Sequence, residues 1–214
     1  TLVDEATFEA AAEGISFRGM DPSHIALIDI HWPNHAFEKY ECDSLVKFGI
    51  RVDEFSKLIR RADKKDAVEI SVGDDSMLHL KMSNSYKREY KSRLIESSAS
   101  STPLPKLNFN SKAVFTAIAF DKVLSDVQVV SEYISIESKS GRITFSGRGD
   151  SGEADITLEA GNEGLEELDA KEESKATYSI DYLSNITKAV VSMGGSVTAE
   201  YSSKMPLRLE FKIA

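Results

Sequence analysis

The sequence predicts an α+β fold made of repeated units, in which a strand leads into a helix and two more strands follow. Three segments align without gaps over nine positions: KFGIRVDEF (47–55), KAVFTAIAF (112–120) and KATYSIDYL (175–183). Each begins with lysine and ends with a large apolar residue, and these ends recur about every 63 to 65 residues. A fixed period is typical of repeated structural units, whereas chance similarity between short apolar strands is the alternative explanation.

Two strand-like runs follow each of these segments, because apolar and polar residues alternate there. The first runs are VEISV (68–72), YISIE (133–137) and SVTAE (196–200), and the second runs are MLHLKM (77–82), RITFSG (142–147) and LRLEFK (207–212). The same period places a helix of an earlier copy about ten residues before Thr1. We therefore expect the first helix to be missing from this sequence.

The first predicted helix covers residues 55–65 and carries apolar and basic side chains on opposite faces. Its apolar residues recur at helical spacing, and its basic residues repeat that spacing two positions later, about 200° around the helix. The apolar set is Phe55, Leu58, Ile59 and Ala62, and the basic set is Lys57, Arg60, Arg61 and Lys64. Asp53 is expected to cap the start of this helix.

Two further helices are predicted at about 117–127 and 181–192, each with one exposed lysine. In the first, the expected inward residues are Ile118, Val123, Leu124 and Val127, and Lys122 points outward. In the second, the expected inward residues are Leu183, Ile186, Ala189 and Val190, and Lys188 points outward.

Two segments lack an apolar period. ESSASSTPLPK (96–106) is rich in Ser and Pro, which is typical of an extended linker over the surface. GNEGLEELDAKEES (161–174) is acidic and predicts a solvated loop with a short helical turn.

The bulk composition favours an intracellular globular protein. The chain has 214 residues, of which 41% are hydrophobic, and this suits one large or two modest domains. The single cysteine, Cys42, excludes an internal disulfide framework and a cysteine-rich metal site. No apolar run approaches the roughly 18 to 20 residues that cross a bilayer, and no signal peptide is recognised. These features predict a soluble protein of a reducing compartment.

The charge pattern singles out FSKLIRRADKK (55–65), which holds five basic residues in a chain of formal net charge −9. An acidic body repels phosphates at long range, so contact with nucleic acid has to be local. No aromatic residues interleave with these side chains, which argues against stacking on single strands. No set of Arg, Asn and Gln stands at a helix start to read base edges. The basic residues are therefore expected to contact phosphates without sequence preference. The alternative is that they form an ordinary solvated face.

The segments FRGMDPSHIALIDI (17–30), 40–72 and KMPLRLEFKIA (204–214) resemble DNA sliding clamps of the proliferating cell nuclear antigen (PCNA) family, in archaeal style. The resemblance implies two similar clamp domains with helices on one face of antiparallel sheets. It places domain 1 at residues 1–95, a connecting loop at 96–106 and domain 2 at 107–214. The first helix and the carboxy-terminal tail of the family are expected to be missing.

The same resemblance implies a processivity factor without catalytic activity or cofactor. Three chains would close head to tail around duplex DNA, whatever its sequence, and dock DNA polymerase, a clamp loader and other replication and repair proteins. An archaeal clamp would act in the cytoplasm at the nucleoid, and a eukaryotic one in the nucleus. The alternatives are a subunit of a heterotrimeric or checkpoint ring, and an acidic enzyme with an unrecognised site.

The resemblance also implies where DNA is bound. By position within the matching segments, the residues that line the hole of the ring are Lys57, Arg60, Lys122 and Lys188. Arg61 and Lys64 join them from the basic set of this sequence. Asp181 and Ser125 stand where relatives often carry basic residues, so the positive lining of domain 2 is expected to be thinner.

Two protein-binding surfaces are implied as well. A groove for partner peptides would be formed by Met20, His24, Ile25, Leu27, Leu104, Pro105, Pro206 and Leu207, although core packing is the alternative for Leu27 and Leu207. The subunit interface would pair the edge strands REYKSRLI (88–95) and GEADITLEA (152–160) through Tyr90, Lys91, Arg93, Glu153 and Asp155.

Two other motifs are set aside. GRGDSG (147–152) fits a dinucleotide-binding pattern, but the alternating EADITLEA that follows predicts a strand, so the motif is interpreted as a hairpin turn. His31 and His35 have the spacing of metal ligands on a helix, but Trp32 and Pro33 between them break a helix.

Overall fold

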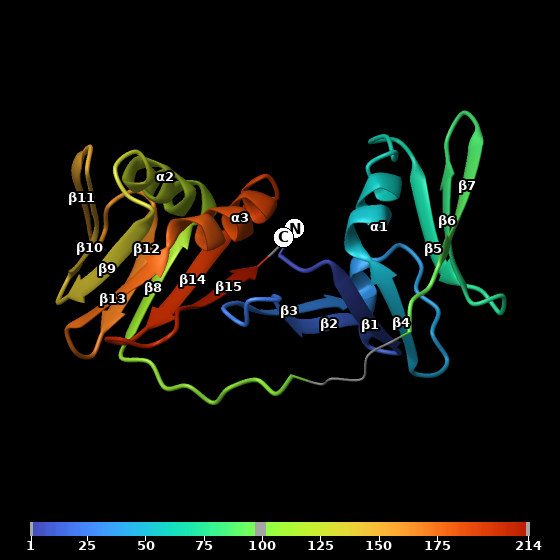
Figure 1. The fold of residues 1–214 in the computed structure, drawn as a ribbon, viewed down its shortest axis with the longest axis horizontal. Coiled ribbons are helices and arrows are strands. Elements are labelled where there is room, and N and C mark those ends of the chain that lie inside the picture. The colour runs from blue at the N-terminus through green and yellow to red at the C-terminus, as the bar shows by residue number, and fades with distance from the viewer. Residues whose placement is uncertain (1, 97–101, 213–214) are drawn as a thin grey trace. The chain divides into compact units, whose positions relative to one another are not determined.

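The computed structural model describes residues 2–96 and 102–212, which fall into two units, Thr1–Leu104 and Pro105–Ala214 (Figure 1). Residues 97–101 of the predicted connecting loop (96–106) lie outside the described residues, and 102–109 form neither helix nor strand. The two units are therefore considered one at a time.

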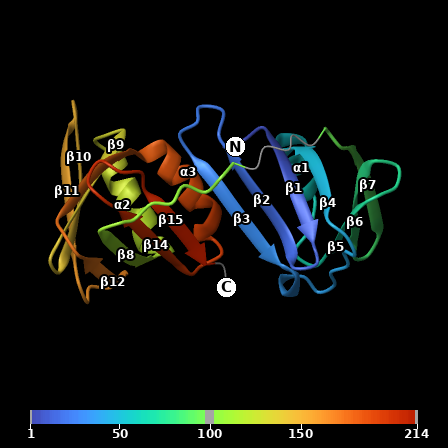
Figure 2. The same ribbon diagram turned by 90° about the horizontal axis from the view of Figure 1, so that it is seen from below.

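The described part of the first unit contains two antiparallel sheets and one α-helix. The first sheet has the order β3-β2-β1-β4, which Figure 2 shows. Its strands are β1 (Glu5–Ala11), β2 (Gly14–Met20), β3 (Leu27–Pro33) and β4 (Val46–Arg51), with a short 3-10 helix η1 (Asn34–Ala36) after β3. The second sheet, β5-β6-β7, follows helix α1 (Val52–Ile59) and consists of β5 (Ala67–Val72), β6 (Met77–Ser83) and β7 (Lys87–Arg93).

The second unit repeats this arrangement with two helices. Its sheets have the orders β11-β10-β9-β13 and β12-β8-β14-β15. The elements are β8 (Ser111–Thr116), α2 (Ala117–Gln128), β9 (Tyr133–Lys139), β10 (Arg142–Gly149), β11 (Gly152–Glu159), β12 (Leu165–Ala170), β13 (Ser174–Ser179), α3 (Ile180–Val191), β14 (Ser196–Tyr201) and β15 (Arg208–Lys212). Helices α2 and α3 pack against each other, and α2 also contacts strands of both sheets (Figure 1).

The predicted repeat corresponds to one structural unit used three times. In each copy a strand runs directly into a helix, as β4 into α1, β8 into α2 and β13 into α3. The sheet β3-β2-β1-β4 of the first unit also has the same strand order as β11-β10-β9-β13 of the second. The predicted α+β fold with antiparallel sheets is therefore confirmed, and GRGDSG forms the predicted hairpin turn between β10 and β11.

The cores of the two units differ in extent. In the second unit the rings of Phe115, Phe120 and Phe145 meet at centroid distances of 5.6 to 6.5 Å and are fully buried. In the first unit the buried cluster is smaller, and every residue of β5 is exposed. The counterpart of β5 in the second unit, β14, pairs on both sides and buries Val197 and Tyr201. β5 pairs only with β6, so its apolar residues remain uncovered in the part of the chain described.

The segment 161–174 does not form the predicted solvated loop. Residues Leu165–Ala170 form β12, which pairs with β8. Leu165 lies opposite Phe115 and is buried, and Lys112 of β8 forms an ion pair with Glu167 at 3.0 Å. A bulge between Leu165 and Glu167 interrupts the alternation of side chains, which is why the strand pattern is absent from the sequence.

Two apolar residues predicted to be buried on helices are exposed. Ile118 of α2 is 68% exposed, because the buried stripe runs from Ala117 through Phe120, Leu124 and Val127. Ala189 of α3 is exposed as well. In α3 the buried stripe includes two polar residues, Ser184 and Thr187, and the Thr187 hydroxyl donates to the carbonyl oxygen of Leu183 at 2.8 Å. An apolar pattern alone could not indicate that face.

Candidate functional site

Most of the basic segment 55–65 lies after helix α1 and not on it. The helix ends at Ile59, so Arg60, Arg61 and Lys64 belong to the turn that leads to β5. The prediction of one continuous helix was wrong, because the N–H groups of Arg61 and Ala62 bond three residues back instead of four. The cationic surface therefore consists of the last turn of α1 and the turn that follows it.

Lys57 is the one basic residue of the predicted set that lies within α1. Its side chain is 77% exposed and its Nζ lies 3.4 Å from Oδ2 of Asp53, one helical turn earlier. Asp53 was predicted to cap the helix, but Arg51 occupies the cap position and Asp53 stands in the first turn. Among the described residues Arg60, Arg61 and Lys64 are exposed and form no ion pair, so their charges are available to an anionic ligand.

A buried ion pair holds the basic turn in place. Arg88 of β7 donates to the carbonyl oxygen of Arg61 at 2.7 Å and to the carboxylate of Asp66. The Asp66 side chain is 1% exposed and also accepts the N–H of Asp63 at 2.8 Å. A cation at the carboxyl end of a helix is also favoured by the helix dipole. These contacts fix the path of the backbone that carries Arg60, Arg61 and Lys64.

The second unit presents fewer positive charges on its helices. Lys122 of α2 and Lys188 of α3 are exposed and form no ion pair with the described residues. Each shares its helix with acid: Asp121 and Asp126 on α2, and Asp181 on α3. Helices α2 and α3 lie side by side, and Gln128 of α2 donates to Asp181 of α3 at 3.4 Å.

The MD-x-SH segment forms a tight turn organised by one buried carboxylate. Asp21 is 4% exposed and accepts the N–H groups of Ser23, Ile25 and Ala26 at 3.0, 2.7 and 2.6 Å. His24 has a φ of 56°, in the left-handed region that non-glycine residues seldom adopt. The turn leaves Ile25 66% exposed, an apolar side chain in a fixed position.

The other residues of the predicted groove fall in both units. Met20 and Leu27 lie opposite each other at the end of the β2–β3 hairpin, and Leu104 is 48% exposed. In the second unit Pro105 and Pro206 are exposed, whereas Leu207 packs against the core. The Tyr178 hydroxyl donates to the Met205 carbonyl oxygen at 2.9 Å and holds the turn before Pro206. Core packing, the alternative for Leu207, is thus observed.

The two strands predicted to join subunits each lie at an edge of a sheet. β7 pairs with β6 only, and β11 pairs with β10 only, among the strands of the described chain. Both strands alternate between exposed and half-buried residues along their length. Each edge thus leaves backbone N–H and C=O groups free to pair with another strand.

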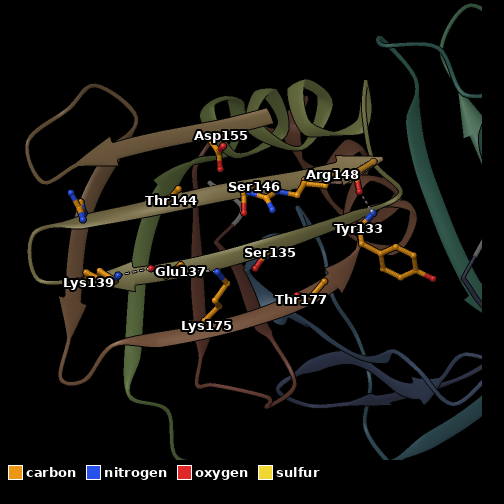
Figure 3. A pocket seen from close by; sticks show the side chains of 13 residues that line it. Tyr133, Ser135, Glu137, Lys139, Thr144, Ser146, Arg148, Asp155, Lys175 and Thr177 are labelled. Carbon is orange, nitrogen blue, oxygen red and sulfur yellow. Dashed lines mark hydrogen bonds and ion pairs between the residues drawn. The ribbon is translucent and has the colours of Figure 1, made fainter. Parts of the chain in front are cut away.

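A polar hollow of about 490 Å³ lies on the outer face of β9, β10 and β13 (Figure 3). Glu137 stands in it between Lys139 and Lys175, whose Nζ atoms are both 2.8 Å from its carboxylate. These two hydrogen bonds lower the pKa of Glu137 to about 2. The residues that line the hollow include no histidine or cysteine, so a nucleophile–base pair of the Ser–His or Cys–His type is not formed there.

Within residues 2–96 and 102–212, no three His, Cys, Asp or Glu side chains are placed to hold a metal ion. Among the helices of these two ranges, none has the length and apolar character to cross a membrane.

The fold and its surfaces define a two-unit α+β protein of strand-to-helix repeats, with exposed basic side chains on the helices or just after them and open sheet edges in each unit. The family descriptions "Proliferating cell nuclear antigen, N-terminal domain" and "Proliferating cell nuclear antigen, C-terminal domain" match residues 1–99 and 103–214. This chain belongs to the PCNA family. The predicted resemblance is confirmed.

Relatives in archaea match along the whole chain. A protein of Nitrosopumilus maritimus named DNA polymerase sliding clamp is 59% identical over 214 residues, which are all of this chain and 86% of the relative. The DNA polymerase sliding clamp of Cenarchaeum symbiosum is 58% identical over the same share of both chains. DNA polymerase sliding clamp 1 of Thermococcus kodakarensis is 34% identical over 212 residues, 99% of this chain and 85% of the relative.

Solved structures agree with this assignment. The crystal structure of PCNA from Thermococcus kodakaraensis superposes with a TM-score of 0.93 at 26% identity, and covers 99% of this chain and 86% of the other. A chain of the PCNA2–PCNA3 complex from Sulfolobus tokodaii gives a TM-score of 0.90 at 25% identity with the same coverage.

Proposed function

We propose that this protein is a DNA sliding clamp, a ring that encircles duplex DNA and keeps DNA polymerase on its template. The observation that carries the proposal is the match of both family domains, with 59% identity to a DNA polymerase sliding clamp over the whole chain. The clamp acts by topology and not by catalysis, because a closed ring stays on DNA without tight binding.

The exposed basic residues are proposed to face the DNA backbone. Lys57, Arg60, Arg61, Lys64, Lys122 and Lys188 are all exposed, and all except Lys57 lack an ion pair among the described residues. Contacts of this kind to phosphates are weak individually, salt-dependent and independent of sequence. Weak contacts permit sliding, while the net charge of −9 discourages DNA from binding elsewhere on the surface.

The ring is proposed to form from three chains arranged head to tail, with β7 of one chain against β11 of the next. Such a contact covers two exposed sheet edges at once and closes when the rotation between subunits is right. Tyr90, Lys91 and Arg93 of β7 would meet Glu153 and Asp155 of β11.

The peptide groove is proposed to use the exposed apolar residues beside the Asp21 turn. Ile25 and Leu104 are exposed apolar side chains that a bound peptide would cover. Partners with short peptide motifs, including DNA polymerase and the clamp loader, would dock there and contact Met20, His24 and Leu27 of the same unit. The place of action is the cytoplasm, at the nucleoid.

A mixed ring is the second candidate, because one structural neighbour is a complex of two different clamp subunits, PCNA2 and PCNA3. Sedimentation of the purified chain distinguishes a ring of identical chains from a mixed ring. A species of three identical chains supports a homotrimer. Assembly only after addition of sister chains supports a mixed ring, and a chain that stays monomeric in both cases contradicts the clamp function.

A further inference from the structure

The two free edge strands, β7 and β11, carry opposite charges on the solvent-exposed faces of their sheets. The exposed residues of β7 are Lys87, Glu89, Lys91 and Arg93, and those of β11 are Glu153, Asp155, Thr157 and Glu159. Three of the four are therefore basic on β7, and three of the four are acidic on β11. Among the described residues, Lys87, Arg93, Asp155 and Glu159 form no ion pair within the chain.

The backbone of β11 directs the N–H and C=O groups of these same residues to the free edge. Gly149 and Gly152 close the two-residue turn between β10 and β11, so the even-numbered residues of β11 bond to β10. The N–H of Ala160, which bonds to Gly141 at 2.9 Å, follows the same alternation. The odd-numbered residues, 153 to 159, are left to pair with a new strand.

The same alternation holds on β7. The carbonyl oxygen of Met77 accepts the N–H of Gly73, so the odd-numbered residues of β6 bond toward β5. The even-numbered residues of β6 therefore bond to their partners on β7, as Leu80 does to Tyr90. The backbone N–H and C=O groups of residues 87, 89, 91 and 93 of β7 consequently point to the free edge. The Ile95 N–H, which bonds outward to Gly49, agrees.

These two edges restrict how β7 and β11 can pair. In an antiparallel pair, two residues that exchange both N–H···O=C bonds stand directly opposite each other. Each must therefore direct its N–H and C=O groups toward the other strand. Only registers that place an odd residue of β7 opposite an odd residue of β11 are therefore possible. A shift by two residues places Glu89 opposite Glu159 in one direction and opposite Asp155 in the other. Like charges directly opposite are unfavourable.

We infer that β7 of one copy of this chain pairs with β11 of a second copy in one register, selected by charge. The pairs are Arg93 with Glu153, Lys91 with Asp155, Glu89 with Thr157 and Lys87 with Glu159. This inference rests on the proposed ring and adds its register. Exposed ion pairs contribute little affinity each, so their role here is to exclude the shifted registers.

The opposite face of the joined strands supports the same register. It places Tyr90 opposite Ile156 and Ser92 opposite Ala154. Tyr90 lies beside Leu80 on β6, and Ile156 lies beside Phe145 on β10, so both belong to the core faces of their sheets. The pairing would join the two core faces, with an aromatic–aliphatic contact at the junction.

Disulfide trapping tests the register. In the full chain with Cys42→Ser, Ser92→Cys combined with Ala154→Cys places two cysteines opposite each other at a Cα distance of about 4.5 Å, within disulfide range. The comparison variants combine Ser92→Cys with Ile156→Cys, and Tyr90→Cys with Ala154→Cys, which match the two shifted registers. In the inferred register their Cα atoms are about 7 to 8 Å apart. We expect covalent multimers on a non-reducing gel for the first variant only.

The outcomes separate the register from the ring. Cross-linking in a comparison variant at least as strong as in the first overturns the register. If the first variant assembles but forms no cross-link, the register is also overturned. Neither of these two results contradicts the clamp function. Chains that sediment as monomers, with cross-links in none of the variants, contradict the ring itself.

A charge exchange gives an independent test. Lys91→Asp and Asp155→Lys each raise the protein concentration at which half of the chains are assembled, and the double variant restores it, because the pair is re-formed with the charges exchanged. In a shifted register the two residues are not opposite, so failure of the double variant to recover overturns the inference.

Discussion

Arg88 of β7 donates a hydrogen bond of 2.7 Å to the carbonyl oxygen of Arg61, just beyond the end of α1. The same guanidinium binds the buried carboxylate of Asp66. One side chain of an edge strand thus fixes the turn that carries the basic residues proposed to contact DNA. The proposed DNA contact and the proposed subunit contact therefore both involve the segment that runs from the end of α1 to β7.

Replacement of Arg88 tests this relationship. Arg88→Met leaves the Asp66 carboxylate, which is 1% exposed, without its cation, and we expect the free energy of unfolding to fall clearly. Denaturation in urea measures the loss. Lys39→Met is the matched control, because Lys39 and its partner Glu41 are both more than 70% exposed and a change below about 0.5 kcal/mol is expected. Equal effects of the two changes would contradict the structural role of Arg88.

The Asp21 turn predicts a defect confined to partner binding. Asp21→Ala removes the acceptor of three N–H groups, so the turn loses its conformation and Ile25 its position. We expect the affinity for a partner peptide to fall at least tenfold, measured by calorimetry, while sedimentation of the protein is unchanged. Ser23→Ala, which keeps the backbone bonds to Asp21, should bind the peptide normally. Full binding by Asp21→Ala would exclude this turn from the groove.

The Glu137 ion pairs predict a pH dependence of stability. The folded pKa of about 2 lies below the ordinary value of 4.5, so the contribution is complete above pH 4.5 and is lost as the pH falls from 4.5 toward 2. Glu137→Gln should lower the free energy of unfolding by about 1 to 2 kcal/mol at pH 7. The difference from the unsubstituted protein should shrink between pH 4.5 and 3. Glu163→Gln, at an exposed position without an ion pair in the described chain, is the control. A difference that stays constant with pH would contradict the assignment.

The cap of α2 gives a smaller, local prediction. The Thr116 hydroxyl oxygen accepts the N–H of Ala119 at 3.2 Å, which satisfies one free donor at the start of the helix. Thr116→Ala should cost about 1 kcal/mol of stability, and Thr116→Ser, which keeps the acceptor, should cost less. Thermal unfolding of the three proteins measures the order, and equal stability of the Ala and Ser variants would show that the hydrogen bond contributes nothing.

The sequence indicated the repeat well, because its signal is redundant. Phe55, Phe120 and Leu183 each follow a strand and lie on the apolar face of a helix, so periodicity and spacing agree. The family resemblance placed edge strands at 88–95 and 152–160, and the structure has β7 at Lys87–Arg93 and β11 at Gly152–Glu159. Edge strands keep a clear alternation, since one face packs on the core and the other meets water.

Where the prediction failed, long-range contacts decide the local structure. The turn that follows the end of α1 at Ile59 is bonded by Arg88, which lies 27 residues after Arg61. β12 forms because β8 offers it a partner, although its own sequence is acidic and bulged. An aspartate before Pro-Ser-His favours a turn, so the sequence indicates the hydrogen bonds that Asp21 accepts. Nothing in the sequence indicates that the Asp21 side chain is buried.

Retention on circular DNA tests most directly whether the protein encircles DNA. The protein is loaded by an archaeal clamp loader onto a nicked circular plasmid, the circle is cut with a restriction enzyme, and the bound protein is measured by gel filtration. We expect the protein to stay on the circular plasmid at moderate salt and to be released after the plasmid is cut. The rate of release should be about the same for plasmids of different sequence.

The variant with Lys57→Glu and Arg60→Glu should be loaded less well, and a Lys39→Glu variant should behave like the unsubstituted protein. Retention that is unchanged when the circle is cut would contradict encirclement, because it would show binding to the DNA surface and not a closed ring around it.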